Sequence, residues 1–138
     1  MDIIRSALEN KQVYDNFIFT DVGFVRGEDR DGIPQAAEFL LRRQGTDTVL
    51  AFGIVDGKCI DGSIRTRSDS LNPDIFLKKT FGRDEESHRY YGGGNISDKG
   101  GFQIPLGLLG QATAQETLYQ MAYDVVRQRF LTAIGWKA

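Results

Sequence analysis

An apolar run followed by an Asp-Gly pair constrains the fold of this chain more than any other feature. Residues 48–55 are almost continuously apolar, and a second strand-like run follows soon after Asp56 and Gly57. A continuous apolar run of this length is typical of a strand buried on both faces. An Asp-Gly pair between two strand-like runs is a strong signal for a β-hairpin. The sequence therefore predicts a buried central strand that pairs antiparallel with the strand after it.

The second strand of this hairpin has two different faces. Successive side chains in a strand point to opposite sides, so the residues of this run divide into two sets. We expect the first set to pack against the core and the second to form a polar face that is available to a ligand. The first set is Ile60, Gly62, Ile64 and Thr66, and the second is Asp61, Ser63, Arg65 and Arg67.

Other segments predict strands and helices around this hairpin. Residues 17–25 are rich in aromatic and β-branched residues and predict a strand. Apolar residues recur at helical spacing in residues 33–41, which predicts a short helix that ends by Gly45. Asn72, followed at once by a proline, predicts the start of a second helix, and Gly82 its end.

A long final helix is predicted near the C-terminus. Thr113 and Glu116 have the spacing of a capping box, and Gly135 is suited to end the helix after about residue 133. We expect its inner face to contain Leu118, Ala122, Val125 and Val126. Strands interleaved with helices, together with one hairpin, predict an α/β (α+β) fold with a mixed sheet flanked by helices.

Two glycine-rich segments follow the hairpin. Residues 92–94 are three consecutive glycines, expected to form a loop, and Gly100 and Gly101 come after Lys99. Glycine allows positive φ and close backbone approach, so several N–H groups of such a loop can converge on an anion. Arg65 offers a planar fork suited to phosphate oxygens. A flexible turn is the alternative interpretation of the glycine cluster.

The Ser-x-Arg-Thr strand at residues 63–66, the Gly-Gly-Gly segment and the later Gly-Gly-Phe segment together resemble the DHH-associated C-terminal domain of the DHH phosphoesterase superfamily. That superfamily includes oligoribonucleases, nucleotide phosphatases and exopolyphosphatase-related proteins. The resemblance is strongest over residues 52–106. It implies that residues 23–138 form a substrate-binding domain, and that residues 1–22 connect it to a separate N-terminal catalytic domain.

The resemblance also implies roles for particular residues. The Ser and Arg at positions 63 and 65 are expected to contact substrate phosphates. The family's glycine loop ends in a histidine, where this chain has Asn95, which can form hydrogen bonds but cannot become a cation. A different substrate class or affinity is therefore expected. The candidate phosphate-binding residues are Ser63, Arg65, Thr66, Gly92, Gly93, Gly94, Asn95, Lys99, Gly100 and Gly101.

Hydrolysis in the resembled superfamily uses two divalent metals, usually manganese, held by aspartates and histidines that include an Asp-His-His run. This sequence has no such run, and His88 is its single histidine. We therefore expect no catalytic residue and no metal in this chain, and manganese in the separate catalytic domain. The acidic cluster at residues 84–86 is expected to be solvated.

Composition limits the partners and the setting. The formal net charge of −2 gives no general basic surface for gripping long nucleic acids. Cys59 is the single cysteine, so no intrachain disulfide can form, which is typical of a reducing, cytoplasmic setting. No apolar run approaches the length of a membrane span, and a soluble protein is expected.

The sequence favours a domain that binds a phosphorylated small molecule or a short oligonucleotide for a manganese-dependent phosphoesterase, and that works with its own N-terminal catalytic domain. Two alternatives stay open, a stand-alone regulatory module that binds nucleotides or nucleic acid, and an assembly domain that forms a homodimer. The sequence does not choose among oligoribonucleotide, dinucleotide, nucleoside bisphosphate and polyphosphate. It also leaves open whether Tyr90, Tyr91 or Phe102 stacks on a base.

Overall fold

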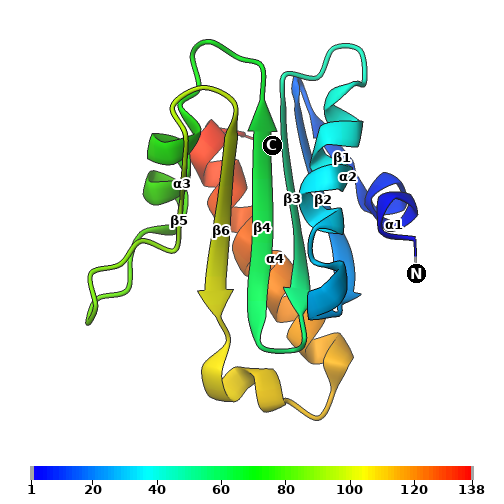
Figure 1. The fold of residues 1–138 in the computed structure, drawn as a ribbon, viewed down its shortest axis with the longest axis vertical. Coiled ribbons are helices and arrows are strands. Elements are labelled where there is room, and N and C mark those ends of the chain that lie inside the picture. Colours follow the sequence, from blue (N-terminus) through cyan, green and yellow to red (C-terminus); the bar gives the residue numbers. More distant parts are fainter. Residues whose placement is uncertain (1, 138) are drawn as a thin grey trace.

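Helices and strands alternate along most of the chain, which is described over residues 2–137 in a computed structural model (Figure 1). The strands are β1 (Gln12–Tyr14), β2 (Phe17–Val25), β3 (Thr48–Val55), β4 (Cys59–Thr66), β5 (Gly92–Gly94) and β6 (Lys99–Pro105). The α-helices are α1 (Ile3–Asn10), α2 (Gly32–Leu41), α3 (Pro73–Phe81) and α4 (Gln115–Ile134), and the short 3-10 helices are η1 (Gly27–Asp29) and η2 (Gly107–Gln111).

The six strands form one mixed sheet in the order β1-β2-β3-β4-β6-β5. Strands β2 and β3 are parallel, and the other neighbouring strands within residues 2–137 are antiparallel. The predicted fold class is therefore confirmed. The predicted β3–β4 hairpin is confirmed too, because Asp56 and Gly57 both have positive φ, as the hairpin turn favoured by an Asp-Gly pair requires.

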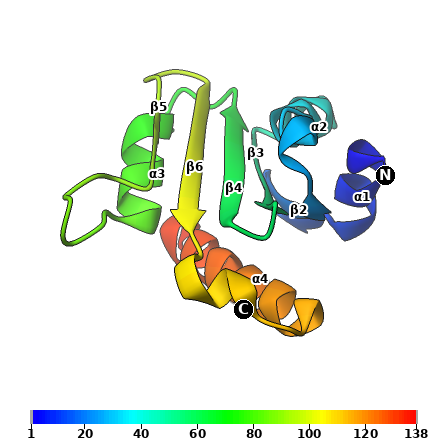
Figure 2. The ribbon, with the colours of Figure 1, turned by 60° about the horizontal axis from the view of Figure 1, so that its bottom comes forward.

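Helices cover both faces of the sheet and create two hydrophobic cores (Figure 2). Helices α1 and α2 pack on one face, where Ala7, Ile33 and Val49 belong to the smaller core. Helices α3 and α4 pack on the other face, where Leu77, Phe130 and the alternate β4 residues Ile60 and Ile64 belong to the larger core. The division of β4 into an apolar and a polar face is therefore confirmed.

Three predicted helix ends agree with the structure, and the start of α4 differs. Gly82 is the C-cap of α3 with a φ of 70°, as predicted. The side chain of Asn72 accepts a hydrogen bond from the backbone N–H of Ile75, so it caps α3 as predicted. Gly135 has a φ of 71° and ends α4. The capping box at Thr113 is wrong, because α4 begins one residue later than that pattern requires, with Ala114 at the N-cap and no side-chain cap.

The inner face of α4 is largely as predicted. Leu118, Ala122 and Val126 are buried, and Val125 is the exception with 48% of its surface exposed. Val125 lies next to Val126 in the sequence, and a helix turns by about 100° per residue, so the two side chains cannot share one narrow buried stripe.

The first 22 residues contribute to the sheet. They include α1, β1 and most of β2, and β1 pairs with β2 at the sheet edge. Gly23, the predicted start of the domain, lies inside β2 with a φ of 71°, beside a shift in the β2–β3 register. The sheet continues across this predicted boundary, and the link to a separate catalytic domain stays a prediction.

Candidate ligand-binding cleft

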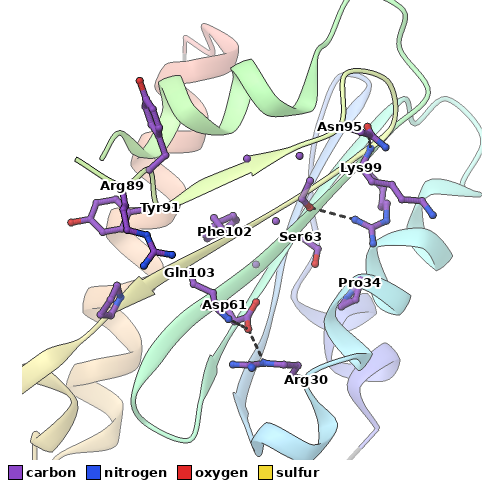
Figure 3. A pocket seen from close by; sticks show the side chains of 18 of the residues that line it. Arg30, Pro34, Asp61, Ser63, Arg89, Tyr91, Asn95, Lys99, Phe102 and Gln103 are labelled. Atoms are coloured by element: carbon purple, nitrogen blue, oxygen red, sulfur yellow. Dashed lines mark hydrogen bonds and ion pairs between the residues drawn. The ribbon is translucent and has the colours of Figure 1, made fainter. Parts of the chain in front are cut away.

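A cleft of about 1010 Å³ lies where the helices leave one face of the sheet open. Helix α2 stands beside β4 on this face, and β6 and β5 extend beyond it (Figures 1 and 3). The floor is formed by β4, β6 and β5, one wall by residues 30–34, and the opposite wall by residues of the segment 84–91. The polar face of β4 predicted from the sequence therefore forms part of the floor of this cleft.

Strand register arranges the floor in three rows. Arg65 pairs with Lys99 at one end of the cleft, and Ser63 pairs with Gly101 in the middle. Asp61 pairs with Gln103 at the other end. Directly paired residues of antiparallel strands place their side chains on the same face. The register therefore brings together Ser63, Arg65 and Lys99, three of the candidate residues from the sequence.

Arg65 is held firmly at its end of the cleft. Its Nε donates to Glu38 Oε1 of α2 at 3.2 Å, and one terminal nitrogen donates to the carbonyl of Ile64 at 2.9 Å. The Arg65 side chain is only 14% exposed, whereas Glu38 is 50% exposed. Lys99 Nζ lies 4.0 Å from the same Glu38 oxygen. Two cations therefore share the Glu38 carboxylate, and the exposed Asp98 outside the cleft lining also interacts electrostatically with both.

Ser63 lies in the centre of the floor (Figure 3). Within residues 2–137 its hydroxyl makes no hydrogen bond, although no fully buried polar side-chain atom in that range lacks a partner. The hydroxyl must therefore be reached by solvent from the cleft. Its strand neighbour Gly101 has no side chain, so a ligand can approach the Ser63 hydroxyl and the bare backbone together.

The predicted glycine loop is a strand. Residues 92–94 form β5 and pair with β6, and none of these three glycines has a positive φ. The N–H of Gly94 is donated to Asp74 Oδ1 at 3.0 Å, and this bond is the main cause of the lowered pKa of Asp74. The convergence of N–H groups on an anion, predicted from positive φ, is therefore wrong for this segment.

The glycines serve close packing instead. A Cβ on Gly94 would overlap the carbonyl of Lys99, and a Cβ on Gly100 would lie 2.8 Å from Leu77 Cδ1. A Cβ on Gly92 would lie 2.9 Å from Phe102 Cβ, on the side of the core, and Gly92 does not line the cleft. Gly93, Gly94, Gly100 and Gly101 do line it. Strand β5 therefore fits against α3 and β6 because it carries no side chains.

Asn95 builds the turn between β5 and β6. Its Oδ1 accepts hydrogen bonds from the backbone N–H groups of Ser97, Asp98 and Lys99, and its Nδ2 donates to Asp98. Asparagine side chains commonly stabilise turns in this way. Asn95 borders the cleft, but the turn uses most of its hydrogen-bonding capacity.

Thr66 lies outside the cleft. It is 2% exposed, and its hydroxyl lies 2.8 Å from the Thr48 hydroxyl and donates to the Asp47 carbonyl. Its place in the predicted ligand site is therefore corrected to a buried structural role, because strand alternation directs it away from Arg65. Arg67 is not a second cation of the cleft either, since its guanidinium contacts the Leu41 carbonyl beyond the end of β4.

Sequence patterns alone do not indicate several residues at the cleft. Pro34 of α2 and Arg30 from the segment before it line the cleft, and Glu38 of α2 contacts Arg65, and all three precede β4 by more than twenty residues. Asp61 belongs to the predicted polar face, but its position predicts no particular role, and neither does that of Gln103. Charged and amide side chains at the ends of paired strands carry no local motif, so the register of β4 and β6 was needed to find them.

A metal centre requires several donor side chains close together. Within residues 2–137, no group of three or more His, Cys, Asp and Glu side chains is arranged to hold a metal ion. The manganese site implied by the resemblance stays an expectation for the separate catalytic domain. His88 is exposed in a turn with a φ of 61° and does not line the cleft. In the same range, no helix combines the length and apolarity needed to cross a membrane.

The fold and the cleft define an α+β domain with a mixed sheet and one partly open sheet face. No protein-family model matches the chain. An uncharacterized protein of Methanocaldococcus jannaschii is 33% identical in an alignment of 138 positions, which covers 99% of this chain and 26% of that protein. The chain therefore spans about a quarter of the length of this relative.

Two solved structures are similar to the chain. The exopolyphosphatase-related protein of Bacteroides fragilis has a TM-score of 0.51 and 13% identity, and the match covers 94% of this chain and 34% of that one. A pGpG-specific phosphodiesterase of Vibrio cholerae has a TM-score of 0.46 and 13% identity, over 92% and 37% of the respective chains. The first likeness confirms the resemblance predicted from the sequence at the level of the fold.

Proposed function

We propose that this chain is a substrate-binding domain that holds a phosphate group of a nucleotide or related phosphoester in the cleft, for a phosphoesterase of the DHH type. The main observation in support is that Arg65 and Lys99 pair across β4 and β6, beside the accessible Ser63 hydroxyl. Arginine and lysine supply charge and N–H donors to phosphate oxygens, and the serine adds a neutral donor. The bare glycine floor lets the ligand reach these groups closely.

The cleft geometry is better suited to a compact anionic group than to a long nucleic acid. Arg65 and Lys99 lie together at one end of the cleft, where Glu38 and Asp98 offset part of their charge, and Arg30 at the other end is paired with Asp61. The overall charge of −2 adds no long-range attraction for a polyanion. We infer that binding relies on short contacts in the cleft, so its dependence on salt is shallow.

Hydrolysis is assigned in this proposal to a separate N-terminal domain that holds manganese. The metal would polarise the scissile phosphate there, while this chain binds a part of the substrate that does not react. Binding energy from such a part can orient the reacting group. The likeness of the fold to part of an exopolyphosphatase-related protein supports this division of work.

The test is a calorimetric titration of the chain with a short oligoribonucleotide, compared with the Arg65→Ala variant. We expect saturable binding that is reduced at least about tenfold in the variant, because a charge-assisted hydrogen bond to phosphate is lost. Arg67→Ala is the matched control, since Arg67 lies two residues along the chain but outside the cleft. It should leave the affinity unchanged.

Two outcomes would contradict the proposal. Equal losses of affinity in the Arg65 and Arg67 variants would show that general positive charge, and not the cleft, governs binding. Absence of binding to any phosphate ligand, together with a stable dimer in solution, would favour the assembly alternative. In the whole protein, Arg65→Ala should raise KM more than it lowers kcat.

A further inference from the structure

The end of the cleft opposite Arg65 has a different chemical character. Asp61 Oδ2 forms an ion pair with Arg30 Nε at 3.0 Å and accepts a hydrogen bond from Gln103 Nε2 at 3.2 Å (Figure 3). The Asp61 side chain is 15% exposed, so it is partly withdrawn from solvent while it still faces the cleft. These three side chains form the polar end of the cleft.

The polar end keeps hydrogen-bond acceptors available to a ligand. Both partners of Asp61 contact the same carboxylate oxygen, Oδ2, and within residues 2–137 no hydrogen bond is made to Oδ1. Gln103 uses its amide nitrogen, which leaves its carbonyl oxygen as a second acceptor. A carboxylate in a partly enclosed site gains most from a ligand that donates N–H or O–H groups.

The charges of the two ends also differ. Arg30 offsets the charge of Asp61 at the polar end, and the rim nearby carries Arg89 and Asp84 with opposite signs. At the other end, Arg65 and Lys99 face the carboxylate of Glu38, and Asp98, which interacts with both, does not line the cleft. A uniformly anionic ligand would be attracted by Arg65 and Lys99 at one end of the cleft. At the polar end, its negative charge would be repelled by Asp61.

We propose that Asp61 and Gln103 form a second subsite, which accepts hydrogen bonds from the organic part of a phosphate ester. The ligand class is then a phosphoester that carries N–H or O–H donors, as a nucleotide or a sugar phosphate does, and not an inorganic polyphosphate. This inference rests on the proposed function, which supplies the phosphate at Arg65. Asp61 and Arg65 are four residues apart on β4, a span of about 13 Å, so one ligand with a phosphate at one end and donors at the other bridges them.

The test compares three probes by calorimetry: adenosine 3′,5′-bisphosphate, ribose 5-phosphate and inorganic tripolyphosphate. The variants are Asp61→Asn, which keeps the shape of the side chain and removes its charge, and Asp31→Asn as a control. Asp31 lines the cleft as well, but makes no side-chain hydrogen bond or ion pair within the described residues. Both substitutions remove one negative charge from the cleft.

We expect Asp61→Asn to lower the affinity for the organic phosphoester about tenfold. The affinity for tripolyphosphate should stay the same or increase. Asp31→Asn should not change the ratio of the two affinities. If Asp61→Asn weakens binding of the bisphosphate alone, the base is the donor. If it weakens binding of ribose 5-phosphate equally, the sugar hydroxyls are the donors. Either response supports the subsite.

The inference is overturned if Asp61→Asn changes all probes by one common factor, or if tripolyphosphate binds the unaltered chain more tightly than the bisphosphate. Failure of the proposed function gives a different result. In that case Arg65→Ala leaves every affinity unchanged, or no probe binds. Either result contradicts both the phosphate site at Arg65 and the second subsite at Asp61.

Discussion

The Tyr119 hydroxyl donates a 2.8 Å hydrogen bond to the carboxylate of Asp21 and so connects α4 to β2 across 98 residues of sequence. Asp21 is 1% exposed, and its carboxylate also accepts from the backbone N–H of Gly23 and from Asn10. Burial raises the pKa of Asp21 in spite of these hydrogen bonds. Burial also raises the pKa of Tyr119, and its bond to Asp21 adds to that shift.

The raised pKa of Asp21 predicts a pH dependence of stability. The folded chain holds the Asp21 proton more tightly than the unfolded chain, whose ordinary pKa is 3.8. The contribution of this group is therefore fully present below that value and is lost as the pH rises through the folded pKa. Urea unfolding of the wild type and Asp21→Asn across this range measures the effect. We expect the stability difference, wild type minus variant, to fall as pH rises, and a constant difference would contradict the prediction.

Tyr119→Phe should reduce the free energy of unfolding by about 1–3 kcal/mol at neutral pH, since a buried carboxylate loses a donor. Tyr123→Phe is the matched control, because Tyr123 lies one helical turn away and its hydroxyl makes no hydrogen bond within residues 2–137. Its loss should change the stability by less than about 0.5 kcal/mol. Equal effects in denaturant titrations would show that the hydrogen bond to Asp21 adds no stability, because both substitutions keep the ring and remove only a hydroxyl.

The two predicted helix caps give a direct comparison. Asn72→Ala removes the hydrogen bond to Ile75 and should cost about 1 kcal/mol. Thr113→Ala removes a side chain that caps no helix, so its effect should stay within about 0.5 kcal/mol. Thermal unfolding of both variants checks this. A loss of stability in Thr113→Ala as large as in Asn72→Ala would show that Thr113 does cap α4.

Glu38→Gln should increase the affinity of the cleft for tripolyphosphate by about threefold to tenfold, because the ligand no longer competes with a carboxylate for Arg65 and Lys99. Glu28→Gln is the control, since Glu28 pairs with Arg26 outside the cleft. A weaker affinity in Glu38→Gln would mean that Glu38 chiefly positions the Arg65 guanidinium. Measurements at low and high salt separate local competition from general charge.

The elements that follow from local patterns were predictable from the sequence. The bounds of β2 and β3 match the predicted strands. The continuous apolar run of β3 admits few alternatives, and the aromatic and β-branched residues of β2 favour a strand. The glycines of β5 predict a loop but form a strand, since local sequence cannot reveal that α3 and β6 leave no room for side chains. Glu38 could not be found because its partner Arg65 is 27 residues away in the sequence. The side chain of Asn95 could bind a ligand or stabilise a turn. Only the structure shows which, because it places three backbone N–H groups against the Asn95 oxygen.

Within the described part of the chain, β2 and β3 are the one parallel pair of neighbouring strands. A parallel pair requires a crossover connection, and α2 is that connection. The same helix forms a wall of the cleft and carries Glu38. The proposed anion site and the crossover of the sheet therefore depend on the same segment. A substitution that shifts α2 on its small buried residues, Ala36 and Ala37, would alter the geometry of the proposed site and the stability of the sheet together.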